Sequence, residues 1–480
     1  MSSITSLEAH RAQPQLDTLQ QIFERQRFAF ERNLMPSAEE RRQNLRKLKQ
    51  ATLRYKDDLA EAVSRDFGCR SRDETMIGDI LPSLNQINYL IKNVKRWMKP
   101  SKRHSSPLLQ PSSAFVVYQP LGVVGIVAPW NYPIQLVLSP LATALAAGNR
   151  AMIKTSEFTP ETNKVLTRLL AESFEQDHVA LVEGEADVAQ AFTRLPFDHL
   201  LFTGSTAVGR HVMRAAADNL TPVTLELGGK SPAIVSDSVP IEDAVERIAF
   251  GKTLNAGQTC IAPDYVLCPA SRMDEFVTAF QRRIARMYPR LRDNEQYTAI
   301  VNDRQYARLR RYLDEAREKG ARVIEINPAS ETLEDVRKLP VTLVLDCNDD
   351  MLLGQEEIFG PILPVVPYDT LDDALEYVRR RPRPLALYYF DYDEERQRYV
   401  LEHTHAGGVS INDTLFHIGQ DDMPFGGVGP SGIGRYHGHE GFLTFSHAKS
   451  VHRKGRFNSA RFIYPPYGAM NKLVYRLFMR

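Results

Sequence analysis

One cysteine and one glutamate stand in settings that suit covalent chemistry. Cys260 ends the run 257–260 (Gly-Gln-Thr-Cys), and Glu226 lies upstream in the run 225–230 (Leu-Glu-Leu-Gly-Gly-Lys). A thiolate nucleophile and a carboxylate base are the two groups needed to carry acyl chemistry through a covalent intermediate. The pair therefore indicates an enzyme.

The alternative is that Cys260 is an inert, buried sulfhydryl, because free cysteine packs as a small hydrophobe. Its context favours the reactive interpretation. Glycine and two small polar residues before a thiol are typical of a tight loop, whose N–H groups can face a developing negative charge. Cys69, Cys268 and Cys347 lack this setting, and we interpret them as packing residues.

Composition bounds the class of protein. The chain has 480 residues, 43% of them hydrophobic and 25% charged, which predicts a globular protein of two or three domains. Lysine and arginine (60) nearly balance aspartate and glutamate (59), so no overall field favours nucleic acid or an anionic membrane. We expect a small-molecule substrate and no nucleic-acid partner.

Cysteine usage and hydropathy predict a cytoplasmic protein. Four scattered cysteines and a polar first thirty residues indicate a reducing compartment without disulfides. The apolar stretch 121–130 is far shorter than the roughly 20 residues of a transmembrane helix. The tail 472–480 mixes cations with large apolar groups. We expect it to dock on the protein or on a partner subunit, and weak contact with an acidic lipid surface is the alternative.

Two regions of alternating strands and helices must position the reactive pair. Residues from about 15 to 100 have helical periodicity, and 114–118 is typical of a strand in a hairpin arm. Repeated strand–helix units then predict a mostly parallel sheet covered on both faces, a doubly wound nucleotide-binding architecture. Its predicted strands are 123–128, 150–154, 180–183, 199–203 and 222–226.

A second α/β region follows Gly229. Its expected strands are 233–235, 265–267 and 341–345, and 303–319 is a charged helix. Cys260 falls near the junction of the two regions, where a cleft is the usual place for a site.

Two weak signals indicate a nucleotide. The strand 199–203 runs into Gly204 and Ser205, where backbone and a helix N-terminus can approach a pyrophosphate, although the spacing fails the G-x-G-x-x-G fingerprint and a plain turn is the alternative. Lys154 and Glu157 follow a strand, and a carboxylate there accepts hydrogen bonds from a ribose diol. That carboxylate would repel a 2′-phosphate, so we favour NAD, with NADP as the alternative. The bland interpretation of this pair is a lysine and a glutamate in a surface loop.

The ordered set of motifs resembles the NAD(P)-dependent aldehyde dehydrogenase superfamily over roughly residues 40 to 450. Each motif is ambiguous alone, and their order is specific. The matching runs are 129–133 (Pro-Trp-Asn-Tyr-Pro), 154–157 (Lys-Thr-Ser-Glu), 202–205 (Phe-Thr-Gly-Ser), 225–230, 257–260, 357–361 (Glu-Ile-Phe-Gly-Pro) and 424–427 (Pro-Phe-Gly-Gly).

The resemblance implies catalytic roles. Cys260 would attack an aldehyde to give a thiohemiacetal, whose alkoxide the Asn131 amide and the Cys260 N–H would hold. Hydride transfer would leave a thioester, and Glu226 would activate the water that hydrolyses it. No metal ligand is assigned.

The resemblance also implies cofactor contacts and a fold. Lys154 and Glu157 would contact the adenine-side ribose, Gly204 and Ser205 the pyrophosphate, and Glu357 and Phe359 the nicotinamide ribose. Relatives often have proline at the position of Thr155, which makes that turn less rigid here. The fold would combine a Rossmann-type domain, an α/β catalytic domain and a small β arm that builds a homodimer. The expected divisions are an NAD-binding domain of 1–101 and 122–228, a catalytic domain of 229–440, an arm of 102–121 and 441–460, and a tail of 461–480.

Finer likeness concerns the substrate. The runs 260–265 and 431–438 resemble the class 3 branch, and 197–199, 213–220 and 323–328 are similar to bacterial coniferyl-aldehyde dehydrogenases. An aromatic, cinnamyl-type aldehyde is therefore expected. The alternatives are a broad medium- or long-chain aliphatic aldehyde dehydrogenase and, in another class, a non-catalytic binding or structural protein with this fold.

Overall fold

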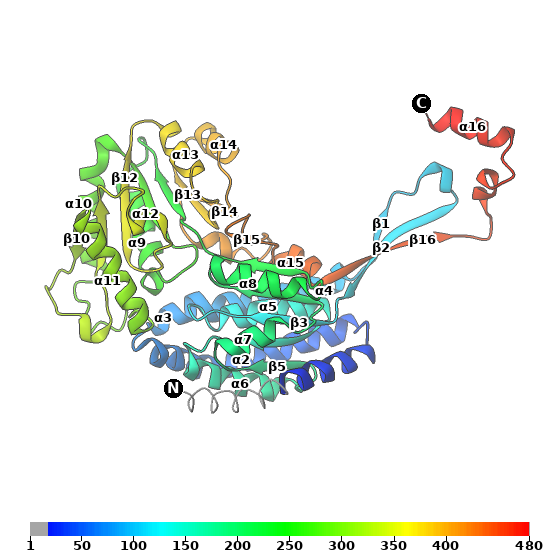
Figure 1. Ribbon diagram of the computed structural model, residues 1–480, viewed down its shortest axis with the longest axis horizontal. Helices are drawn as coiled ribbons and strands as arrows, with labels where there is room; N and C mark the ends of the chain where they lie inside the picture. Colours follow the sequence, from blue (N-terminus) through cyan, green and yellow to red (C-terminus); the bar gives the residue numbers. More distant parts are fainter. Residues whose placement is uncertain (1–17, 480) are drawn as a thin grey trace, which may run out of the picture.

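A computed structural model describes residues 18–479 (Figure 1). The positions 1–17 of the first predicted domain and residue 480 of the tail lie outside this range. Within it the strands form three sheets of six, seven and three strands, and helices cover the two larger ones. The predicted α/β class is confirmed.

The six-stranded sheet has the order β15-β7-β6-β3-β4-β5. Every pair is parallel except β15 with β7. Its inner strands are buried on both faces, which explains why they are apolar at almost every position. All five predicted strands are confirmed, with ends shifted by at most a residue: β3 Val123–Val127, β4 Arg150–Lys154, β5 Val179–Val182, β6 His199–Thr203 and β7 Val223–Glu226, joined by β15 Gly432–Ile433.

Two groups of helices cover the faces of this sheet. One core cluster packs α2, α4, α5 and α6 against it, and another packs residues 18–31, α7 and α8 on the opposite face. Apolar side chains at three- and four-residue spacing form these contacts, as the sequence predicts for the first hundred residues. The helices are α2 Ala38–Phe67, α3 Arg72–Thr75, α4 Leu81–Trp97, α5 Gln135–Ala147, α6 Pro160–Ser173, α7 Ala186–Thr193 and α8 Thr206–Ala217.

The seven-stranded sheet has the order β10-β11-β12-β9-β8-β13-β14 and is parallel apart from β10. Strands β8, β9 and β11 match the predicted strands. The bounds are β8 Pro232–Val235, β9 Tyr265–Pro269, β10 Arg322–Ile326, β11 Val341–Leu345, β12 Ile362–Tyr368, β13 Ala386–Phe390 and β14 Gly408–Ile411.

Helices again lie on both faces of the second sheet. Helices α9 and α10 pack on one face, and α11, α13 and α14 on the other. These helices are α9 Ile241–Thr253, α10 Met273–Met287, α11 Asp303–Glu318, α12 Leu352–Gln355, α13 Leu371–Arg379 and α14 Glu394–His403. The charged helix predicted at 303–319 is therefore α11.

A three-stranded antiparallel arm extends away from the body (Figure 1). It consists of β1 Ser101–Arg103, β2 Ser112–Pro120 and β16 Ser446–Lys454, and α15 Gly438–Thr444 links it to the body. Helix α16 Ala469–Phe478 lies beyond the arm, near the C-terminus of the chain. Its apolar side chains, Leu473 and Leu477 among them, are exposed.

The chain crosses the predicted domain limits at one place. Strand β15 lies in the range 229–440 that we assign to the catalytic domain, yet it pairs with β7 of the six-stranded sheet. The division into domains stays a prediction. Among residues 18–479, no helix is long and apolar enough to span a membrane.

Candidate active site

A cavity of about 310 Å³ lies where the carboxyl ends of β6 and β7 meet loops of the seven-stranded sheet. Ligands of open α/β sheets bind at this end of the strands. The cavity brings together the three predicted catalytic residues and four of the six predicted cofactor residues. Its lining is Pro129, Trp130, Asn131, Thr203, Gly204, Ser205, Glu226, Gly228, Cys260, Gln305, Arg308, Tyr312, Glu356, Glu357 and Phe359.

The loop before Cys260 has an unusual backbone. After α9 ends, Asn255, Ala256 and Gly257 have φ values of 55°, 51° and 71°, in the left-handed region. At Gly257 a β-carbon would lie 2.5 Å from the carbonyl oxygen of Gly360, so no larger residue fits. The tight loop predicted from the glycine and small polar residues is confirmed.

Buried amide side chains hold this loop. Gln258 Nε2 donates to the carbonyls of Asn255 and Ala299 (3.0 Å each), and Gln258 Oε1 accepts from Val301 N (3.0 Å). Asn255 Nδ2 donates to the Asn131 carbonyl (3.0 Å). These bonds fix the backbone that presents the thiol, because the amides that make them are buried.

The Cys260 thiol is partly exposed to the cavity and strongly shielded from bulk water. Its pKa is raised to about 12, first by burial and then by the charges of Glu357 and Glu226, while the N–H groups of Cys260 and Ile261 act in the opposite sense. The thiol is therefore protonated at neutral pH in this state. Its activation requires a base or a nearby positive charge, since the thiolate is the nucleophile.

Asn131 lies in the β3–α5 loop beside the nucleophile. Its side chain is buried, and Nδ2 donates to the Gln258 carbonyl at 3.1 Å, which uses one of its two hydrogens. Its own carbonyl accepts from Arg70 Nη1 and Asn255 Nδ2, both at 3.0 Å. The second amide hydrogen remains for a ligand, from a group whose orientation is already set.

Glu226 is the last residue of β7. It pairs with Thr203 on one side and with Gly432 of β15 on the other, and its side chain is buried. Neither carboxyl oxygen has a hydrogen-bond partner among the described residues. Burial raises the pKa of Glu226 well above its ordinary value of 4.5, and the charge of Arg435 opposes this rise.

Glu357 approaches Gly228 from the other side of the cavity. A β-carbon on Gly228 would lie 2.1 Å from Glu357 Oε2, so glycine is needed here to admit the carboxyl group. Glu357 Oε1 is buried without a partner among residues 18–479. Burial raises the pKa of Glu357 to about 8, and the charge of Asp264 adds to the rise.

A network of bonds fixes the backbone around Glu357. Lys230 forms an ion pair with Asp264 and donates to the carbonyls of Leu353 (2.7 Å) and Glu356 (3.0 Å). Asp264 Oδ1 accepts from Ile358 N at 2.9 Å. The lysine of the run 225–230 thus positions the loop that carries Glu357.

Phe359 follows on the same loop with φ 51°. Its ring packs edge-on against Trp130, with 5.3 Å between centroids. Arg308 of α11 donates to the Ile358 carbonyl at 2.8 Å. Aromatic packing and one guanidinium therefore hold the strained turn in place.

The predicted pyrophosphate turn also faces the cavity. Gly204 N donates to the Glu226 carbonyl at 3.0 Å, and Ser205 caps α8 by accepting from Val208 N at 3.4 Å. The first N–H groups of a helix are suited to bind a phosphate.

Lys154 and Glu157 do not line this cavity. Lys154 is buried and its ammonium donates to the Thr155 carbonyl. Burial lowers the pKa of Lys154, while Glu157 and other acids act in the opposite sense. Glu157 is exposed. The Thr155 hydroxyl is buried and unpaired among the described residues.

Several cavity residues were not predicted. Gln305, Arg308 and Tyr312 lie on one face of α11, at spacings of three and four residues. Periodicity predicts this face, but only the tertiary arrangement turns it toward the cavity. Glu356, which the sequence suggests is a solvated neighbour of Glu357, is exposed and also reaches the cavity wall.

His437 is buried outside this cavity, between the rings of Tyr436 and Phe425. Burial lowers its pKa to about 3.

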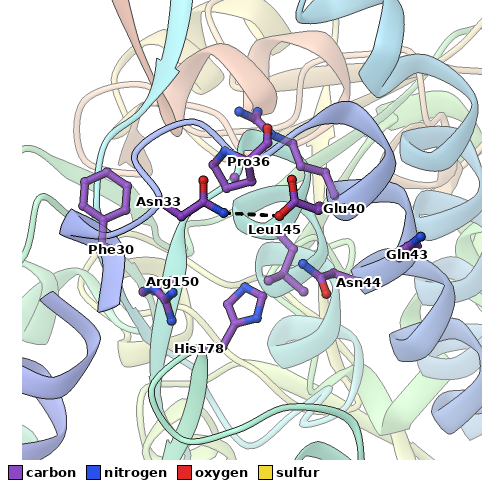
Figure 2. A pocket seen from close by; sticks show the side chains of 11 residues that line it. Phe30, Asn33, Pro36, Glu40, Gln43, Asn44, Leu145, Arg150 and His178 are labelled. Atoms are coloured by element: carbon purple, nitrogen blue, oxygen red, sulfur yellow. Dashed lines mark hydrogen bonds between the residues drawn. The ribbon is translucent and has the colours of Figure 1, made fainter. Parts of the chain in front are cut away.

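A separate cavity of about 240 Å³ lies at the opposite, amino end of β4 and β5 (Figure 2). Arg41 donates there to the carbonyls of Ala146 (3.2 Å) and Ala147 (2.6 Å), and Asn33 donates to Glu40 at 3.2 Å. These bonds tie helix ends together. Its lining contains no cysteine, so the covalent chemistry belongs to the first cavity.

Comparisons with known proteins agree with this geometry. Residues 9–451 match the aldehyde dehydrogenase family. A probable coniferyl aldehyde dehydrogenase of Pseudomonas aeruginosa is 60% identical over 471 residues, which cover 98% of each chain. The chain belongs to the aldehyde dehydrogenase family. It is an enzyme of that class, and the non-catalytic alternative is not retained.

Solved structures confirm the expected fold. A substrate-bound AldH of Staphylococcus aureus is similar with a TM-score of 0.91 and 39% identity, over 96% of this chain and 99% of that one. Betaine aldehyde dehydrogenase of the same organism, in complex with NAD⁺, has a TM-score of 0.83 and 28% identity, over 92% and 88% of the two chains.

Proposed function

We propose that the chain oxidises aromatic, cinnamyl-type aldehydes, coniferyl aldehyde among them, to carboxylic acids with NAD as the hydride acceptor. The observation that carries the chemistry is the meeting of Cys260, Glu226 and Asn131 at one cavity. The substrate proposal is supported by the 60% identity to the probable coniferyl aldehyde dehydrogenase.

The first step is capture of the aldehyde by Cys260. The thiol proton passes to Glu226, which releases it to solvent before the hydrolysis step. The sulfur attacks the carbonyl carbon, and negative charge develops on the oxygen. The free hydrogen of the Asn131 amide and the Cys260 N–H hold that charge. Such fixed donors stabilise the transition state because they need no reorganisation during the reaction.

Residues at the cavity fit an NAD molecule. The unpaired Glu357 Oε1 is an acceptor for ribose hydroxyls, and the start of α8 offers N–H groups to a pyrophosphate. When bound, NAD supplies an electron-deficient ring that accepts the hydride. Phe359 and Glu357 would orient the nicotinamide end of the cofactor, and the Lys230–Asp264 pair holds the loop that carries them.

The last step is hydrolysis of the thioester on Cys260. Glu226 takes a proton from water, whose oxygen attacks the acyl carbon, and the sulfur leaves. A carboxylate with a raised pKa is suited to this step, since general bases work best near the operating pH. The absence of hydrogen-bond partners among the described residues leaves both oxygens for the water.

The cofactor preference rests on Glu157. Its exposed carboxylate beside Lys154 would accept hydrogen bonds from the adenine-side ribose and repel a 2′-phosphate. We expect NAD to bind more tightly than NADP. Dissociation constants for the two cofactors test this, and tighter binding of NADP would contradict the role of Glu157.

The experiment for the substrate is a rate comparison. Purified protein with NAD is mixed with coniferyl aldehyde or with decanal, and reduced cofactor is followed by absorbance. We expect a higher kcat/KM with coniferyl aldehyde. A higher value with decanal would favour the medium- or long-chain aliphatic alternative.

The arm supports a proposal about assembly. We infer that the chain is cytoplasmic and forms a homodimer, with 102–121 and 441–460 at the interface. We also retain the predicted division of the rest of the chain into an NAD-binding domain, 1–101 with 122–228, and a catalytic domain, 229–440. The projecting sheet and the exposed apolar side chains of α16 support a partner subunit as the surface that covers them. A purely monomeric mass in solution would contradict this. Binding of the chain to acidic vesicles would favour lipid as the contact of the tail.

A further inference from the structure

The carboxyl group of Glu226 has a cation nearby but no contact with it. A β-carbon on Gly426 would lie 3.1 Å from Glu226 Oε1 and 3.0 Å from Arg435 Cγ. The stem of Arg435 and the carboxyl group of Glu226 therefore lie on the same side of Gly426, where the Gly434 carbonyl oxygen, 2.2 Å from the same point, also leaves no space for a larger residue. The pairing of Gly432 with Glu226 in the β15–β7 ladder brings the segment with Arg435 to this place.

Arg435 is exposed, and neither oxygen of Glu226 receives a hydrogen bond from it or from any other described residue. Guanidinium groups at the protein surface commonly pair with acids. Here the nearby acid is the buried Glu226, whose oxygens are also unpaired. The separation exceeds the 4.0 Å of a direct ion pair, so a water molecule can occupy the carboxyl oxygens without displacing a guanidinium.

Two further titratable groups among the described residues interact with Glu226, and neither carries a positive charge. They are the Cys260 thiol, from the loop after α9, and the Tyr436 hydroxyl, from the segment after β15. Thr203 pairs with Glu226 from β6. Ionising a buried carboxyl group among such neighbours is costly unless a cation compensates for the lost water. Arg435 is the cation that acts on Glu226 in this way.

We propose that Arg435 is a positioning residue for thioester hydrolysis, stabilising ionised Glu226 from a distance while leaving its oxygens free to hold water. The inference rests on the proposed role of Glu226. In the step, a water O–H bond breaks and its proton goes to Glu226. The water oxygen bonds to the acyl carbon, the carbon–sulfur bond breaks, and Cys260 leaves as a thiolate that Arg435 does not touch.

The test measures the acyl-enzyme directly. Arg435→Gln, Arg435→Lys and Glu226→Gln are mixed with NAD and an aldehyde that the unmodified enzyme oxidises, at pH 6 to 9. Intact mass then gives the fraction of chains carrying an acyl group during turnover. Arg383→Gln is the matched control, because Arg383 is an exposed arginine that contacts Gly429 of the same segment but not Glu226.

We expect Arg435→Gln to accumulate acyl-enzyme, and its kcat to fall roughly tenfold near neutral pH, a tenfold effect being that of one pKa unit in the base. The acidic limb of the kcat–pH profile moves to higher pH. Arg435→Lys keeps the positive charge, so we expect its kcat to stay within about threefold of that of the unmodified enzyme. Arg383→Gln shows neither change.

Two results overturn the inference. One is an unchanged acyl fraction and pH profile in Arg435→Gln. The other is an equal loss in Arg435→Gln and Arg383→Gln, which would indicate a general effect on the segment. If Arg435→Gln does not fold, Arg435→Met, which removes the charge and keeps the length of the side chain, replaces it in both measurements. Failure of Glu226→Gln to accumulate acyl-enzyme would instead overturn the proposed role of Glu226.

Discussion

Two buried carboxyl groups, those of Glu226 and Glu357, line the active-site cavity, and their surroundings differ. Glu357 stands on a loop that Lys230, Asp264 and Arg308 hold by hydrogen bonds to its backbone. Glu226 ends a strand of the sheet, and its carboxyl group has no partner among residues 18–479. Burial raises the pKa of both groups.

The difference in contacts suits Glu357 to orienting a ligand and Glu226 to transferring a proton. A group that must meet ribose hydroxyls at one distance benefits from a fixed backbone. A group that must take up and release a proton benefits from free oxygens and a raised pKa. The same burial therefore suits the two proposed functions, because the surrounding contacts differ.

Loss of the proposed nucleophile, Cys260, has the largest expected effect. Without it no thiohemiacetal forms to donate a hydride, and no thioester forms for Glu226 to hydrolyse. We expect Cys260→Ser to lower kcat at least about a thousandfold, since a serine hydroxyl is a much weaker acid than a thiol and a poorer nucleophile. Steady-state oxidation of coniferyl aldehyde measures this. Cys347→Ser, which alters a half-buried thiol outside the cavity, is the control. Undiminished oxidation by Cys260→Ser would refute the mechanism.

Exchanging the two carboxyl groups for amides tests the comparison itself. Glu226→Gln removes the base, and we expect kcat to fall about a hundredfold or more, with the KM for NAD nearly unchanged. Glu357→Gln weakens the ribose contact, so the KM for NAD rises more than kcat falls. Kinetics at varied NAD and saturating aldehyde separate the two patterns. The same kinetic pattern in both variants would show that the two carboxyl groups do not have separate roles.

The bonds to the Glu357 loop allow a milder test. Arg308→Lys loses the bond to the Ile358 carbonyl, so we expect the KM for NAD to rise about fivefold, which corresponds to the net contribution of roughly one hydrogen bond. Arg311→Lys is the matched control, because Arg311 is an exposed neighbour on α11 that makes no bond to this loop. Equal KM values for both variants would mean that Arg308 does not hold the loop.

The sequence predicted the strands and the reactive motifs because these depend on local patterns. The five strands of the first sheet are apolar runs with glycine or helix signals between them, and each was found. The reactive pair and Asn131 lie in motifs whose order is specific. The support of Glu357 was not predicted, since Lys230, Asp264 and Arg308 come from three distant elements that only the fold brings together.

The strand β15 illustrates the same limit. Two residues, Gly432 and Ile433, return from the second region to pair with β7. No periodicity can be seen in so short a segment. Its effect on the site is nevertheless direct, because it places Arg435 near Glu226.

The smallest expected effect is on stability, and it depends on pH. The pKa of Glu357 is about 8 in the folded chain and near 4.5 when unfolded. Between these values the folded state holds a proton that the unfolded state has lost, so the free energy of unfolding falls as pH rises, by at most about 1.4 kcal/mol per pH unit. Glu357→Gln cannot titrate and lacks this slope.

Urea denaturation of both proteins at pH 5, 6.5 and 8 measures the difference between their free energies of unfolding. Contributions of Glu226 and other groups cancel in that difference, provided that the substitution leaves their surroundings intact. We expect the unmodified chain to lose stability relative to Glu357→Gln across this range. Parallel curves would mean that Glu357 is already ionised in the folded state. Glu357 and Glu226 would then differ in charge as well as in their contacts.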